Sequence, residues 1–113
     1  MKLKTFTLAM ASLASLGLAG SALAQKKYDT GANDKEIVVG NINPYSGPAS
    51  AYGSIGKSIG AYFDMINAEG GINGRKIKYI SVDDGYNPAK TVEQARKLVE
   101  QDEVFLLFQP LGT

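Results

Sequence analysis

The feature that most constrains the fold of this chain is its alternation of short apolar runs with helical patterns. Three apolar runs are separated by two stretches in which apolar residues recur at helical spacing. Strands that alternate with amphipathic helices form a parallel sheet, so we expect an α/β fold of β-α-β-α-β order, the start of a three-layer lobe. The predicted strands are 36–42, 76–82 and 104–108, and the predicted helices run from about residue 49 or 50 to 69 and from 88 to 101.

Both predicted helices carry an apolar stripe that should face the sheet. The stripes consist of Ile55, Ile59, Tyr62, Phe63 and Ile66 in the first helix, and of Val92, Ala95, Leu98 and Val99 in the second.

Several residues predict how the helices pack, begin and end. Gly56 and Gly60 each lower helix propensity by about 1 kcal/mol relative to Ala, so we expect them where close packing excludes a side chain. Gly70-Gly71 should end the first helix, with one glycine in the left-handed conformation. Asn87 is a natural N-cap for the second helix, and Pro88 suits its first position.

The loops that leave the predicted strands contain no motif for catalysis or cofactor binding. The first lacks the G-x-G-x-x-G spacing of dinucleotide-binding proteins, and Gly56-Lys57-Ser58 lies inside a helix without the upstream glycine of a P-loop. The sequence has no His and no Cys, which removes zinc sites and Ser-His-Asp catalysis from this stretch. We therefore predict no metal, no cofactor and no enzymatic activity.

Asp83 and Asp84 are adjacent carboxylates at the end of the second predicted strand. Their side chains should point in opposite directions, so one of them could face a cleft and bind a cation. The favoured alternative is that both accept backbone N–H groups in the turn before Asn87.

The loop after the first strand contains candidate ligand-binding residues. Ser46 and the residues after it lead into a helix, whose N–H groups and dipole favour a small ligand carboxylate. Tyr52 could cover an apolar ligand while its hydroxyl bonds a polar group, and the alternative is a surface or interdomain tyrosine. Thr113 offers a hydroxyl beyond the third strand, next to Gly112.

Residues 1–24 have the pattern of a cleaved secretory signal peptide. Lys2 and Lys4 precede an apolar stretch, and a small-x-small sequence predicts cleavage before Gln25. A membrane anchor is the weaker alternative, because polar and small residues interrupt the stretch. Cleavage changes the formal net charge from +1 to −1 through loss of the two lysines, so we expect no nucleic-acid partner.

Two further expectations concern the organisation of the chain. Residues 25–35 are polar and are predicted to form a flexible leader before the first strand. The sequence stops five residues after the third predicted strand, so we expect residues 36–113 to be the front part of a longer lobe.

Three segments resemble the branched-chain amino acid ABC transporter binding proteins, the leucine-binding protein family. They are PYSGPASAYG at 44–53, NAEGGINGRKI at 67–77, and DDGYNP at 83–88 followed by the second helical stripe. The resemblance extends over residues 36–113 and implies a type I periplasmic binding protein, in which two α/β lobes close on a solute. This chain would supply only part of lobe one and, by itself, no useful affinity for solute.

The resemblance also implies a site and a function. In the family, the loop after the third strand holds the ligand carboxylate, which points to Leu111, Gly112 and Thr113, and an aromatic near the first helix maps to Tyr52. The implied function is capture of a branched-chain or related amino acid in the periplasm and its delivery to an inner-membrane permease of an ABC transporter. The alternative is a periplasmic ligand-sensing receptor domain of the same fold.

Overall fold

The computed structural model describes residues 27–112, so the predicted signal peptide and Thr113 lie outside the described residues. Its order of elements confirms the predicted alternation of strands and helices. The elements are β1 (Glu36–Asn43), a 3-10 turn (Ser50–Tyr52), α1 (Gly53–Ala68), β2 (Lys76–Asp83), α2 (Pro88–Glu100) and β3 (Leu106–Leu107).

The strands form a parallel sheet in the order β2-β1-β3. β1 pairs with β2 along its whole length, from Glu36 opposite Lys76 to Asn43 opposite Asp83. β3 is shorter than the predicted run 104–108, although the Phe108 N–H still donates to the Gly40 carbonyl at 2.7 Å. The chain leaves the sheet at the next residue, because Gln109 adopts a left-handed φ of 47°.

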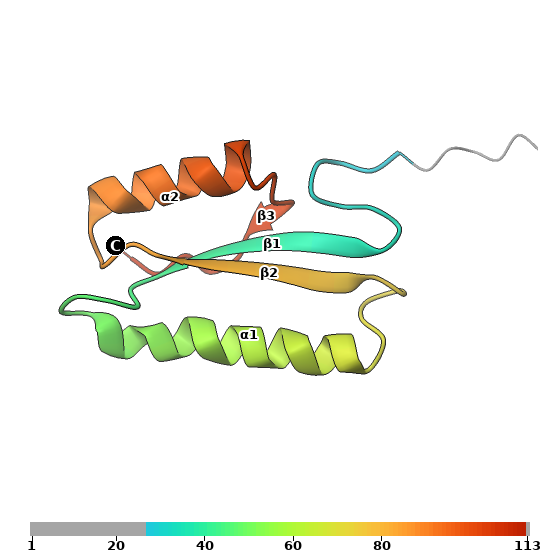
Figure 1. The fold of residues 1–113 in the computed structure, drawn as a ribbon, viewed down its shortest axis with the longest axis horizontal. Coiled ribbons are helices and arrows are strands. Elements are labelled where there is room, and N and C mark those ends of the chain that lie inside the picture. The colour runs from blue at the N-terminus through green and yellow to red at the C-terminus, as the bar shows by residue number, and fades with distance from the viewer. Residues whose placement is uncertain (1–26, 113) are drawn as a thin grey trace, which may run out of the picture.

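The two helices cover opposite faces of the sheet and give three layers (Figure 1). On the α2 face, Val38, Ile42, Leu98 and Val104 form the buried apolar cluster, with Ile80, Val82, Ala95 and Leu107 packed around it. On the α1 face, the centroid of the Phe63 ring lies 5.4 Å from that of Tyr79 and 5.8 Å from that of Phe108.

The predicted helix stripes are correct in part. Tyr62 is 57% exposed, because it lies one residue away from the line through Ile59, Phe63 and Ile66. On α2, Leu98 is fully buried, whereas Val92 and Val99 are 55% and 53% exposed. Nothing among the described residues covers these two side chains, so the apolar stripe of α2 extends beyond its buried face.

The glycines of α1 follow the packing prediction at one position and not at the other. A Cβ at Gly56 would lie 2.1 Å from the Tyr45 hydroxyl oxygen, which confirms close packing there. A Cβ at Gly60 would lie 3.5 Å from the Tyr79 ring, an ordinary contact, so the packing prediction was wrong for this residue. A Cβ at Gly53 would lie 2.8 Å from the Tyr45 ring, so Gly53 also packs closely.

The predicted helix ends are confirmed. Gly70 and Gly71 both have positive φ, and the Gly71 N–H donates to the Ile66 carbonyl at 2.9 Å in a Schellman arrangement. Asn87 caps α2, because its Oδ1 accepts from the Ala89 and Lys90 N–H groups at 2.9 and 3.3 Å.

Residues 27–35 make more defined contacts than their polar composition predicts for a flexible leader. The Val38 N–H donates to the Gly31 carbonyl at 2.7 Å. Arg75 donates to the Asn33 carbonyl at 2.7 Å, and its guanidinium carbon lies 5.1 Å from the centre of the Tyr28 ring. The leader is thus anchored at the start of β1 and β2. Between residues 27 and 112, no helix has both the length and the hydropathy needed to cross a membrane.

Candidate functional site

Asp83 joins the loops that leave β1 and β2 at the carboxyl edge of the sheet, where ligands bind in parallel α/β folds. Its Oδ1 accepts from the backbone N–H groups of Tyr45 and Gly85 at 2.8 and 2.9 Å. Its Oδ2 accepts from the Ser46 hydroxyl at 2.5 Å. The Ser46 hydroxyl, followed by the Gly85 N–H, lowers the pKa of Asp83 to about 2.

Asp84 organises the loop after β2 and the first turn of α2. Its side chain is 1% exposed, and its two oxygens accept from the Tyr86 N–H at 2.9 Å and from the Thr91 hydroxyl at 2.6 Å. Both aspartates therefore serve as turn acceptors, which confirms the favoured interpretation. Among residues 27–112, no group of three or more acidic side chains is arranged to hold a metal ion.

Asn41 holds the loop after β3 against the sheet. Its side-chain amide donates to the carbonyls of Phe108 and Gln109 at 2.8 and 2.9 Å, and its Oδ1 accepts from the Ser81 hydroxyl at 2.7 Å. Asn43 also donates to that oxygen, and both asparagines are fully buried. Sequence reasoning missed this network, whose only signal was two asparagines inside an otherwise apolar strand.

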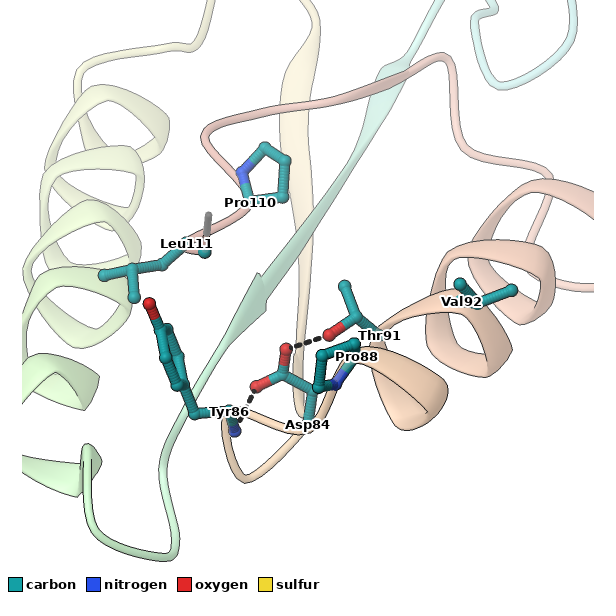
Figure 2. A pocket seen from close by; sticks show the side chains of 8 residues that line it. Asp84, Tyr86, Pro88, Thr91, Val92, Pro110 and Leu111 are labelled. Atoms are coloured by element: carbon teal, nitrogen blue, oxygen red, sulfur yellow. Dashed lines mark hydrogen bonds between the residues drawn. The ribbon is translucent and has the colours of Figure 1, made fainter.

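A pocket of about 330 Å³ opens between the loops after β2 and β3, beside the N-terminus of α2 (Figure 2). In Figure 2, the Tyr86 hydroxyl points toward Leu111, so the two loops approach each other across the pocket. The pocket is lined by Asp84, Tyr86, Pro88, Thr91, Val92, Pro110, Leu111 and Gly112.

Of the predicted ligand-binding residues, Leu111 and Gly112 line this pocket, and Thr113 lies outside the described residues. The Leu111 N–H donates to the Ile42 carbonyl at 2.9 Å. Leu111 therefore contributes its side chain to the pocket, while its N–H is bonded to the end of β1.

Ser46 and Tyr52 do not line the pocket. The hydroxyl and the N–H of Ser46 both donate to Asp83, which ties this residue to the structure of the edge. Tyr52 lies in the 3-10 turn before α1 and is 57% exposed. Its N–H donates to the Ala49 carbonyl at 3.0 Å, so part of the predicted anion site is occupied by backbone bonds.

Tyr86, Thr91 and Val92 line the pocket but were not predicted as site residues. Val92 was assigned to the buried stripe of the helix. Tyr86 has a left-handed φ of 59°, which is uncommon for a residue with a side chain. The Asp-Asp-Gly-Tyr sequence signals a turn, but it gives no indication of where the ring points.

Comparisons with known proteins identify the family of the chain. The sequence profile of the family described as "Periplasmic binding protein" matches residues 36–113. The chain is 34% identical over 97 residues to an amino acid binding protein of Pseudomonas aeruginosa, covering 85% of this chain and 23% of that protein. It is 38% identical over 101 residues to a Leu/Ile/Val-binding protein of Rhizobium johnstonii, covering 88% and 24%.

The fold comparison gives the same result. A fatty acid ABC transporter substrate-binding protein from Thermomonospora curvata superposes with a TM-score of 0.67 at 29% identity, covering 77% of this chain and 22% of that structure. The chain thus spans about a quarter of the length of the curated relatives it matches. With its parallel sheet and a profile match over residues 36–113, the chain belongs to the periplasmic binding protein family.

Proposed function

We propose that this chain is part of the solute-binding component of an ABC importer and that its solute is a branched-chain or related amino acid. The observation that carries the proposal is the apolar pocket at the carboxyl edge of a sheet whose sequence belongs to this family. The names of the two curated relatives support an amino acid as the solute. The name of the structural relative supports a role in an ABC transporter.

In this proposal, two loops at the carboxyl edge of the sheet contact different parts of the ligand. Gly112 and Thr113 bind the solute carboxylate through backbone N–H groups and the Thr113 hydroxyl, and Tyr52 covers the ligand from the loop after β1. The absence of His and Cys is consistent with binding without catalysis. Closure of a second lobe, supplied by further sequence, completes the site.

The proposed location is the periplasm, where the protein passes its solute to an inner-membrane permease. The support is the signal-like sequence of residues 1–24, ahead of a family match that begins at residue 36. Mass spectrometry of the protein purified from the periplasm should find a mature N-terminus at Gln25. A protein that retains Met1 in the cytoplasmic fraction would contradict this location.

The function is tested with the complete product of the gene that encodes this chain. A thermal-shift screen against leucine, isoleucine, valine, alanine and a medium-chain fatty acid should show the largest increase in melting temperature with a branched-chain amino acid. A shift with the fatty acid alone would contradict the proposed solute class. No shift with any small molecule would contradict the proposed function.

A further inference from the structure

We propose that Asn41 is a positioning residue for the carboxylate loop, the chain from Phe108 to Gly112 that follows β3. The proposal rests on the proposed function, in which Gly112 and Thr113 bind the solute carboxylate. In this role Asn41 acts through the backbone of the loop rather than by contact with the solute. It fixes the path along which the chain reaches these two residues.

The carboxylate loop does not continue the regular hydrogen-bond ladder of the sheet. Three N–H groups on this side of the sheet donate to three carbonyls of β1, namely Phe105 to Val38, Phe108 to Gly40 and Leu111 to Ile42. The chain therefore advances three residues for every two residues of β1, whereas a regular parallel ladder advances equally on both strands. The loop carries extra backbone at this point, and the ladder alone does not define its path.

The Asn41 side chain supplies the bonds that fix this extra backbone. Its amide nitrogen donates to the carbonyls of Phe108 and Gln109 at 2.8 and 2.9 Å. Gln109 has a left-handed φ of 47°, and the next residue, Pro110, has no N–H that could bond to the sheet. The Asn41 amide thus holds the loop at the turn where its own backbone provides the fewest bonds.

The chemistry of these contacts suits a short side-chain amide. Both loop carbonyls only accept, so a hydroxyl at position 41 could serve one of them and an ionised carboxylate neither. The Oδ1 of Asn41 accepts in turn from the Ser81 hydroxyl at 2.7 Å and from the side-chain amide of Asn43. Because Ser81 gives its one proton to Asn41, the Tyr45 hydroxyl donates to Ser81. The amide is therefore oriented from β1, from β2 and from the loop after β1.

The burial of this network indicates a role other than stability. Asn41 and Asn43 lie in the central strand and are fully buried. Replacing both partners of a buried hydrogen bond with apolar groups of the same shape can be nearly neutral for stability. Stability alone therefore gives no reason for two asparagines here. Buried polar networks do hold the groups that they join in one arrangement, which is what a binding loop requires.

The first test separates the position of the loop from the stability of the fold. In the complete gene product, Asn41→Ala should weaken L-leucine binding by about tenfold, the equivalent of one hydrogen bond to a charged group. Binding of L-leucinamide should change by less than about twofold, because this ligand has no carboxylate for the loop to hold. Calorimetric titration measures both affinities.

Asn67→Ala is the matched control. Asn67 makes the same kind of contact at the start of β2, where its side chain donates to the Ile77 carbonyl at 2.8 Å and accepts from the Ile77 N–H at 2.7 Å. Because this contact lies at the opposite edge of the sheet, its loss should lower the melting temperature and change leucine affinity by less than about twofold.

A milder variant keeps the proposal testable if Asn41→Ala does not fold. Ser81→Ala removes the hydroxyl that orients the Asn41 amide and should weaken leucine binding by about threefold, the equivalent of one neutral hydrogen bond. Ser81→Thr is its matched control, because threonine keeps a hydroxyl and favours strands, and it should retain the wild-type affinity.

The outcomes separate the positioning role from the proposed function. A wild-type protein that binds no amino acid contradicts both. A wild type that binds leucine, with unchanged leucine affinity in Asn41→Ala or, if that variant does not fold, in Ser81→Ala, contradicts the positioning role alone. Equal losses for leucine and leucinamide, or an equal loss in Asn67→Ala, also contradict it and assign Asn41 a purely structural role.

Discussion

At the residue scale, the glycines of α1 differ in what a side chain would meet. Gly56→Ala should destabilise the protein by roughly 1–3 kcal/mol, because the new Cβ would lie 2.1 Å from the Tyr45 hydroxyl oxygen. Gly60→Ala is the control, since its Cβ would make an ordinary contact at 3.5 Å from Tyr79 and should gain up to about 1 kcal/mol of helix propensity. Urea unfolding of the two variants measures the difference, and equal midpoints would contradict this interpretation.

The low pKa of Asp83 predicts how the free energy of unfolding changes with pH. Hydrogen bonds from Ser46 and Gly85 favour the ionised carboxylate and lower its pKa in the folded state from 3.8 to about 2. Its stabilising contribution is therefore fully present above about pH 4 and is lost as the pH falls toward 2. The difference in urea midpoint between wild type and Asp83→Asn should be constant above about pH 5 and shrink below pH 4. A difference that does not change with pH would contradict the assignment.

Single residues also mark the limit of what sequence reasoning can predict here. The Asn87 side chain caps backbone N–H groups two and three residues away, and Gly70 acts through its own φ, so local sequence was sufficient to predict their roles. Asn41 acts on carbonyls of residues 108 and 109, more than sixty positions away, and depends on the register of the sheet. The contacts of Ser46 and Tyr86 likewise depend on which loops the topology brings together.

At the scale of elements, the cap of α2 should contribute measurably to stability. Asn87→Ala removes the acceptor for the Ala89 and Lys90 N–H groups and should cost about 1 kcal/mol. Asn87→Ser is the matched control, because serine retains a capping oxygen. Denaturant unfolding followed by circular dichroism provides the measurement, and an alanine variant as stable as the serine variant would show that the cap contributes nothing.

The elements also show where periodicity succeeds and where it fails. It predicted both helices and the first two strands closely, because each has a run of apolar residues long enough to define its period. It overestimated the length of β3 and the number of buried residues in the apolar stripe of α2. Val92 and Val99 can be buried only if another element packs against them, and the periodicity of a helix does not indicate whether such an element is present.

At the scale of the whole molecule, the β3 side of the sheet exposes apolar side chains. Phe105, Leu106 and Phe108 are 41–45% exposed in or next to the edge strand β3. A chain limited to residues 25–113 should therefore self-associate at micromolar concentration. Analytical ultracentrifugation should detect oligomers that Leu106→Lys reduces, with Lys57→Arg on α1 as control. A monomeric wild-type chain with a cooperative melt would contradict this prediction.

Calorimetric titration with L-leucine tests the central claim most directly. The complete gene product, without its signal peptide, should bind with a micromolar or lower Kd. Residues 25–113 alone should give no saturable heat, because the chain spans about a quarter of its relatives and a site between two lobes needs both. Failure of the complete product to bind leucine, isoleucine or valine, or equal affinity in residues 25–113, would contradict the account.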